Sequence, residues 1–253
     1  MKTIKDIFEN AAINHEYINE SKCLKDDCEE FNILKKEYLL EPGVSFVVSR
    51  PGVGKTTFAL DIVLEQALKN DASIFIFSPE KTAEEVAERL FDKIKCHTSR
   101  SLIQKFSNIC IEDFKDNTLD AVRQIEKLIE NTCKECFVLV DSLDCLWTNG
   151  RGKKITFKER ARLSDKLSEL AKKRNIKLLV SNYVTKEDFE SLVCGELPQY
   201  LKSVNTILLL DRQSYFLDDE FYTKSELQII SSGNTKTKIE LDYNGMLRRF
   251  VRR

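Results

Sequence analysis

The stretch that decides the fold is Ser49-Arg50-Pro51-Gly52-Val53-Gly54-Lys55-Thr56-Thr57. A short apolar, β-branched run at residues 44–49 leads into it, and residues 56–69 continue it with helical periodicity. A strand, a glycine-rich turn, Gly-Lys-Thr and a helix, in this order, are the context that a P-loop requires. The stretch therefore predicts a binding site for a nucleoside triphosphate, ATP, together with Mg²⁺.

The positions of this loop have separate roles. Gly52 and Gly54 allow backbone conformations that are closed to other residues, so the chain can approach phosphate oxygens. The unpaired N–H groups of the following helix attract the anion. We expect Lys55 to reach the outer phosphates and the Thr56 hydroxyl to bind Mg²⁺. The predicted nucleotide-binding set is Arg50, Pro51, Gly52, Val53, Gly54, Lys55, Thr56 and Thr57.

Strand and helix patterns alternate after the loop. Apolar runs at 73–77, 108–112, 136–140 and 176–181 alternate with helical patterns at 82–94, 118–131 and 157–174. This rhythm predicts an α/β domain whose parallel sheet is covered by helices on both faces. Strand-like runs with short connections follow at 205–210, 226–231, 238–243 and 247–251. They predict an antiparallel C-terminal extension.

Two carboxylates stand where parallel strands end. Asp141 closes the run 136–140, at the sheet edge where ligands bind, so it is interpreted as the Walker B acid of the Mg²⁺ site. Its alternative role is to cap the next turn. Glu80 follows the run 73–77 and is expected beside a neighbour of the P-loop strand, close to the γ-phosphate. There it would be a general base. The alternative is a glutamate in the first turn of a helix that only interacts favourably with the helix dipole, and the residue type does not distinguish the two roles.

Composition excludes some classes of protein. The chain has 253 residues and a net charge of −1, so no global basic field attracts nucleic acid, although a local basic groove is compatible with this charge. No apolar run approaches the roughly 18 residues that a membrane span needs, and the first residues lack a signal-peptide core. A cytoplasmic protein without membrane contact is expected.

Residues 1–40 differ from the rest. Helical spacing of apolar residues begins at Ile4, and residues 20–37 are dense in charge, so a helical leader or linker is expected before a domain at 41–253. The alternative is a helix that docks on a neighbouring subunit. Cys133 and Cys136 have CxxC spacing, with Cys23 and Cys28 upstream, but buried small residues are favoured over a zinc site.

Several segments together resemble a known family. Residues 49–60 (SRPGVGKTTFAL), 74–89, 108–113, 138–146 and 160–176 are similar to the RecA-type ATPase domain of the DnaB family of replicative DNA helicases. The resemblance covers about residues 40–253 and implies a RecA-like P-loop fold, single-stranded DNA as partner, and a homo-oligomeric ring or filament. It also implies that Glu80 activates water and that Arg212 matches a family arginine at the nucleotide.

The chain departs from the family at two places. The family's sensor strand ends in Ser-Gln, whereas here Ser181 precedes Asn182, which has the same amide on a shorter stem. The family also carries a Lys-x-Arg that acts in trans, and the positions after 226–230 hold no charge; Lys236 and Lys238 lie downstream. An arginine finger is worth about 10³- to 10⁵-fold in turnover, so we expect slow basal hydrolysis unless a partner supplies the finger.

A cationic segment is the candidate DNA contact. It comprises Arg151, Lys153, Lys154 and Lys158, and continues to Arg160 and Arg162. The resemblance implies that this loop faces a central channel, where it would follow phosphates without reading bases. The alternative is a solvated basic loop. The tail cluster Arg248, Arg249, Arg252 and Arg253 is expected to be a solvated end.

Three functions therefore compete on sequence alone. The first is a DNA-dependent ATPase with weakened catalysis, acting in DNA replication or a mobile element. The second is a nucleotide-gated binding module with little hydrolysis. The third is a RecA-type ATPase of a branch that does not act on DNA.

Overall fold

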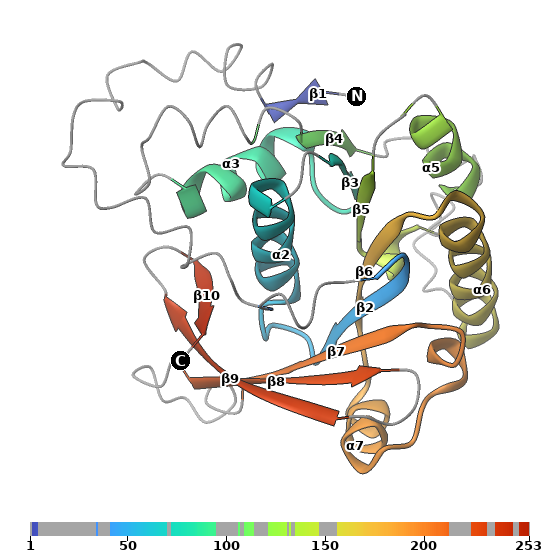
Figure 1. Ribbon diagram of the computed structural model, residues 1–253. Coiled ribbons are helices and arrows are strands. Elements are labelled where there is room, and N and C mark those ends of the chain that lie inside the picture. Colours follow the sequence, from blue (N-terminus) through green and yellow to red (C-terminus); the bar gives the residue numbers. More distant parts are fainter. Residues whose placement is uncertain are drawn as a thin grey trace.

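The computed structural model describes residues 2–4, 34, 41–69, 72–94, 106, 109–113, 121–130, 132, 135–146, 156–212, 224–231, 236–244 and 248–252. Figure 1 shows one continuous twisted sheet with helices packed against it. Among the described helices, none has the length and apolar character that a membrane crossing needs.

The sheet has a parallel centre and antiparallel edges. Across it lie, in order, the parallel strands β4 (Ile109–Asp113), β3 (Ser73–Ser78), β5 (Cys136–Asp141), β6 (Lys177–Tyr183), β2 (Gly43–Ser49) and β7 (Thr206–Asp211). The antiparallel strands β8 (Lys224–Ser231), β9 (Lys236–Asn244) and β10 (Arg249–Arg252) continue from β7. Every residue of β2 and β5 is buried, as expected for parallel strands that are covered on both faces.

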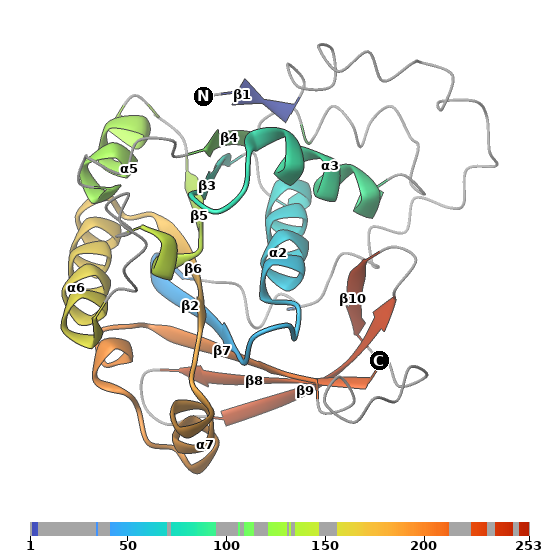
Figure 2. The same ribbon diagram turned by 180° about the vertical axis from the view of Figure 1, so that it is seen from behind.

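Helices cover both faces. α2 (Lys55–Lys69) and α3 (Ala83–Ile94) pack on one face, where Phe58 and Ile62 belong to the first apolar cluster. α5 (Ala121–Glu130) and α6 (Phe157–Arg174) pack on the other, where Leu167 belongs to the second. Figure 2 shows the same two groups from behind. The predicted α/β sheet with an antiparallel extension is confirmed.

Local signals explain where α6 begins and ends. Thr156 caps the helix by accepting a hydrogen bond from the Glu159 N–H, and the Glu159 side chain accepts one from the Thr156 N–H at 2.7 Å. Asn175 ends the helix in a left-handed conformation, with φ of 52°. The predicted bounds 157–174 are those observed.

Residues 184–203 connect β6 to β7. They contain α7 (Lys186–Cys194) and the short 3-10 helix η5 (Gln199–Leu201). A second 3-10 helix, η4 (Leu143–Cys145), follows β5. Thr185 caps α7 by accepting a bond from the Asp188 N–H at 3.1 Å, and Gly195 ends it with φ of 96°.

Two expectations about the chain ends need revision. The prediction of a solvated C-terminal tail is wrong for the described residues, because β10 pairs with β9 and Arg249 is 0% exposed. At the other end, β1 (Lys2–Thr3) pairs with β4 at the sheet edge, and Ile4 and Leu34 are buried. These parts of the predicted leader therefore pack on the domain; its other residues lie outside the described ranges.

Candidate nucleotide-binding site

The P-loop, residues 49–57, connects β2 to α2 at the carboxyl edge of the parallel strands. Gly52 and Gly54 have φ of 82° and 111°, which only glycine adopts without strain. The Gly54 carbonyl accepts from the Phe58 N–H at 2.9 Å and so starts the helix. Arg50 fixes the outer side of the loop, since its guanidinium lies 3.2 Å from an Asp211 oxygen and 5.1 Å from the centre of the Phe189 ring.

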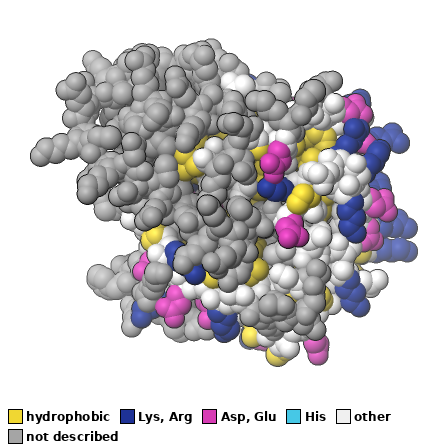
Figure 3. All heavy atoms as spheres, in the orientation of Figure 1, with side chains coloured by type: hydrophobic (Ala, Val, Ile, Leu, Met, Phe, Trp, Pro, Cys, Tyr) yellow, Lys and Arg dark blue, Asp and Glu magenta, His cyan; other side chains and the backbone are white. Residues whose placement is uncertain are grey.

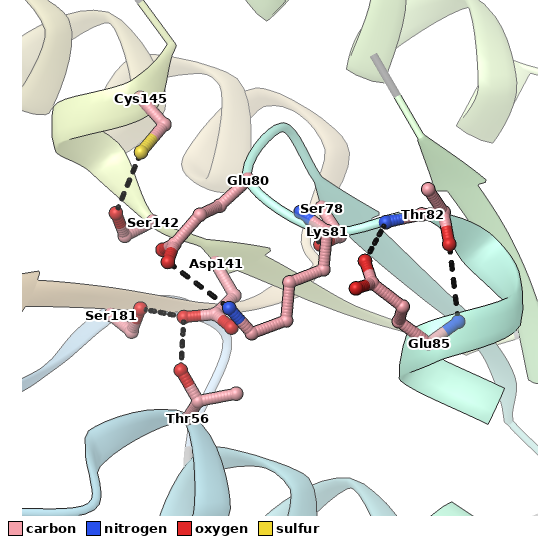
Figure 4. Close-up of polar contacts among 10 residues, drawn as sticks. All are labelled: Thr56, Ser78, Glu80, Lys81, Thr82, Glu85, Asp141, Ser142, Cys145 and Ser181. Atoms are coloured by element: carbon pink, nitrogen blue, oxygen red, sulfur yellow. Dashed lines mark hydrogen bonds and ion pairs between the residues drawn. The ribbon is translucent and has the colours of Figure 1, made fainter. Parts of the chain in front are cut away.

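Thr56 and Asp141 meet at the end of β5. The Thr56 hydroxyl donates to Asp141 Oδ1 at 3.2 Å, and the Ser181 hydroxyl donates to the same oxygen (Figure 4). β5 and β6 are paired with Asp141 opposite Ser181, which places these side chains together. Burial raises the pKa of Asp141, and the two hydroxyl bonds oppose that rise. Hydroxyl and carboxylate oxygens are ligands that Mg²⁺ accepts, so the predicted metal pair fits the ion chemically.

Lys55 lies among acids. Burial lowers the pKa of Lys55, and the charges of Asp141, Asp144 and Glu80 oppose this shift. Its ammonium also lies 5.9 Å from the centre of the Tyr183 ring. A cation in these surroundings, at the start of a helix, is placed to neutralise the charge of outer phosphates.

Glu80 lies beside Asp141 but not where we expected it in the sheet. β3 pairs with β4 and β5, so Glu80 borders the strand that carries Asp141, and not a neighbour of β2. The order of strands depends on tertiary packing, which local patterns do not encode. Glu80 is half exposed and pairs with Lys81 at 3.0 Å (Figure 4). Sequence reasoning missed Lys81, whose charge lowers the pKa of Asp141.

Tyr183, not Asn182, lies next to the P-loop lysine. Successive side chains of a strand point to opposite faces, and Ser181 points to Asp141. Asn182 therefore points to the other face, where it is buried beside Tyr200. The prediction that Asn182 ends the strand as a phosphate sensor does not fit this placement. Counting by two from Ser181 would have indicated Tyr183.

Arg160 is mostly buried against the protein. Its guanidinium lies 2.7 Å from an Asp144 oxygen, 5.4 Å from the Tyr183 ring centre and 5.9 Å from that of Tyr200. In the same helical turn Lys158 is exposed, and Phe157 is 50% exposed, with its ring perpendicular to that of Tyr200 at 5.7 Å between centroids. Of the predicted cationic segment, Lys158 and Arg162 lie on the surface and Arg160 is turned to Asp144; Arg151, Lys153 and Lys154 lie outside the described residues.

The surface of α5 and α6 mixes both charges. Figure 3 shows lysines and arginines alternating with acids on the side where these helices lie. Lys173 and Arg174 of α6 pair with Glu126 of α5 at 2.8 and 3.2 Å. This part of the described surface offers no continuous cationic track.

Arg212 follows β7, and the cations near it in the antiparallel extension have partners in the chain. The Arg212 guanidinium lies 4.4 Å from the Tyr243 ring centre. Lys238 pairs with Glu226 at 3.0 Å, and Arg248 pairs with Asp92 at 3.3 Å. Lys236 opposes Ile230 in the β8–β9 pair, and its side chain is not described.

Cys136 is part of the buried face of β5. Burial raises the pKa of its thiol to about 12. Cys23, Cys28 and Cys133 lie outside the described residues, and among those that are described no group of three His, Cys, Asp or Glu side chains could hold a metal ion. Cys136 thus has the place of a buried apolar residue.

Comparison with known proteins gives a consistent result. A family model described as the DnaB-like helicase C terminal domain matches residues 39–188. The replicative DNA helicase DnaC of Bacillus subtilis (strain 168) is 24% identical over 209 residues, which are 73% of this chain and 46% of the relative. The chain therefore spans about half the length of that curated relative.

Solved structures show the same fold. An ATPase domain of known structure superposes with a TM-score of 0.67 at 17% identity, over 85% of this chain and 86% of that one. A DnaB-like replicative helicase, whose structure describes its interactions with primase, gives 0.65 at 18% identity, over 84% of this chain and 57% of that one. The RadB recombinase gives 0.58 at 17% identity, over 83% of this chain and 90% of that one. The predicted RecA-like P-loop fold is confirmed.

Proposed function

The chain belongs to the family of DnaB-like helicase C-terminal domains, and from this premise we propose that it is a Mg²⁺-dependent ATPase that single-stranded DNA stimulates. The observation that carries the proposal is the convergence of Lys55, Thr56 and Asp141 at the carboxyl edge of the sheet. We assign residues 41–253 to the ATPase unit and residues 1–40 to an N-terminal leader, of which residues 2–4 and 34 pack on that unit.

In this proposal the chain's own groups divide the work. The backbone N–H groups of the P-loop and the Lys55 ammonium bind and orient the phosphates, since both present positive charge at one point. The Thr56 hydroxyl and the Asp141 carboxylate hold Mg²⁺, which when bound offsets the negative charge that builds up on the transferred phosphoryl group. The nucleotide is held in its orientation by Arg50, Arg212 and the remaining loop residues.

Glu80 is the proposed general base. It follows β3 next to Asp141, and its half-exposed carboxylate can accept a proton from a water that attacks the terminal phosphate. Its ion pair with Lys81 must open or rotate for this step, because the Lys81 ammonium occupies the carboxylate oxygen Oε1 at 3.0 Å. We therefore expect slow basal turnover that rises when a ligand or a second copy of the chain rearranges this loop.

A second candidate function is a nucleotide-gated binding module. The Glu80–Lys81 pair and the in-chain pairing of Lys238 and Arg248 favour it, since each leaves the chemistry short of a group. In that case Mg-ATP controls assembly into a ring or filament, or the binding of a partner, with little hydrolysis.

The test is steady-state ATP hydrolysis with and without single-stranded DNA, for the wild type, Lys55→Ala and Glu80→Gln. Stimulation by DNA that disappears in both variants supports the ATPase. Binding of Mg-ATP without hydrolysis, both with and without single-stranded DNA, would contradict the proposed ATPase activity and leave the nucleotide-gated binding module. Light scattering with and without Mg-ATP measures the proposed oligomer in the same samples.

A further inference from the structure

A phenylalanine near the C-terminus touches the P-loop. A Cβ built on Gly54 would lie 3.2 Å from Cζ and 3.3 Å from Cε2 of Phe250, so the tip of this ring lies directly against the glycine. Phe250 is 0% exposed and belongs to β10, which lies next to α2 in both views (Figures 1 and 2). The C-terminal strand thus forms one wall of the loop.

Phe250 is itself held from three sides. Its backbone N–H donates to Asp61 Oδ2 at 2.9 Å, which fixes the strand to α2. Its ring contacts Phe58 edge-on at 5.7 Å between centroids and Tyr243 at 5.1 Å. Because Phe58 lies one helical turn after Gly54, the same ring contacts both ends of the first turn of α2.

A buried charge cluster anchors this strand. Lys93 of α3 donates to Asp61 of α2 at 2.8 Å and also to the carbonyl of Arg248, while the Arg249 guanidinium lies 3.9 Å from Asp61. Asp61, Lys93 and Arg249 are each at most 1% exposed. Buried ions that are paired in this way fix geometry strongly, because losing one partner leaves an uncompensated charge.

We propose that Phe250 is a positioning residue of the nucleotide site. In a P-loop without nucleotide, several backbone N–H groups converge on one concavity and repel one another. Packing against the loop opposes the change of conformation that would separate them. The Phe250 ring, fixed by the Asp61 cluster, backs Gly54 in the left-handed conformation that aims these groups at the phosphates. A loop that is set before binding loses less freedom when the ligand arrives, so its affinity is higher.

The inference rests on the proposed binding of Mg-ATP, and it predicts an effect on binding more than on chemistry. We expect Phe250→Leu to raise the Kd of Mg-ATP about 10-fold in calorimetric titration and to change kcat at saturating ATP by less than about 3-fold. The matched control is Phe137→Leu, which removes the same atoms from the same apolar cluster at the far end of β5. Both variants lower the melting temperature, and only Phe250→Leu raises the Kd.

A double-mutant cycle separates contact from general loosening. Gly54→Ala carries two costs, the strained φ of 111° and a tight contact of 3.2 Å with Phe250, whose ring must shift by a few tenths of an ångström. The strain in φ is the same in the wild type and in Phe250→Leu, whereas the contact with residue 250 is relieved when leucine replaces the ring. We therefore expect Gly54→Ala to weaken Mg-ATP binding at least about 3-fold less in Phe250→Leu than in the wild type. If Phe250→Leu does not fold, Phe250→Met takes its place, because it keeps most of the volume without the rigid ring.

The outcomes are distinguishable. A wild-type protein that does not bind Mg-ATP would overturn the proposed function and this inference with it. Wild-type binding together with an unchanged Kd in the Phe250 variants, or with additive effects in the cycle, would overturn the inference alone.

Discussion

The end of β5 and the antiparallel extension use charge in opposite ways. At the end of β5, Lys55 lies among Asp141, Asp144 and Glu80, at the edge where a triphosphate would bring its own negative charge. In the extension, Lys238 pairs with Glu226, Arg248 with Asp92 and Arg249 with Asp61 of the same chain. The first region is arranged for a ligand and the second for holding the chain together. Substitutions should therefore change binding in one region and stability in the other.

The largest effect is expected on stability. Asp61→Ala leaves Lys93 and Arg249 as two buried cations, so the free energy of unfolding should fall by about 3–5 kcal/mol. Urea denaturation measures this. The control is Asp92→Ala, which removes an ion pair whose Arg248 side chain is 63% exposed and which should cost only about 0–1 kcal/mol. Equal losses in the two variants would contradict the distinction between a buried anchor and a surface pair.

The second effect is on binding. Lys55→Ala should raise the Kd of Mg-ATP by at least about 100-fold, since a half-buried cation placed to meet the phosphates is lost. Its melting temperature should stay within a few degrees of wild type or rise, because burial of this ammonium is unfavourable without a ligand. Titration calorimetry and thermal denaturation test both parts, with Lys172→Ala on the exposed face of α6 as control. Parallel losses of binding and stability would show that Lys55 is structural.

Local patterns were enough for the elements of the first region. The β2–P-loop–α2 unit and the carboxylate at the end of β5 depend on neighbours in sequence, so periodicity and residue type predict them. What failed depends on distant partners. Arg249 is buried because its strand is held against α2 by the bond from the Phe250 N–H to Asp61, 189 positions away in the chain. The place of Glu80 depends on the order of strands, which no single segment contains.

The sequence indicated Asn182 beside the nucleotide, whereas the structure places Tyr183 beside Lys55, and the cause of this difference is another one. Both residues end β6, and the two alternatives differ by one position in a strand whose side chains alternate. The contact between Ser181 and Asp141 settles the register. A carboxylate on one strand and a hydroxyl on its neighbour were visible in the sequence, but their pairing was not.

The third effect compares these two residues directly. Tyr183→Leu removes the ring beside Lys55, so the Kd of Mg-ATP should rise about 3- to 10-fold, which lies between the values for an exposed and a desolvated cation–π contact. Tyr183→Phe keeps the ring face and should bind as the wild type does. Asn182→Ala should leave binding within about 2-fold, because its side chain lies on the α6 face beside Tyr200. The reverse order, with Asn182→Ala the more damaging, would restore the amide as the nucleotide sensor.

The smallest effect is expected in the extension. Lys238→Ala removes a 63% exposed side chain whose ion pair with Glu226 is worth about 0–1 kcal/mol, so the free energy of unfolding should fall by no more than this and kcat should stay within about 2-fold of wild type. A weak surface pair can open at little cost, and Lys238 could then reach a neighbouring copy. Hydrolysis measured at rising protein concentration separates the two cases, with Glu226→Gln as the variant that releases Lys238. A drop of about 10³-fold in Lys238→Ala, or a gain in Glu226→Gln that grows with concentration, would make Lys238 the trans-acting cation and move the extension into the catalytic machinery.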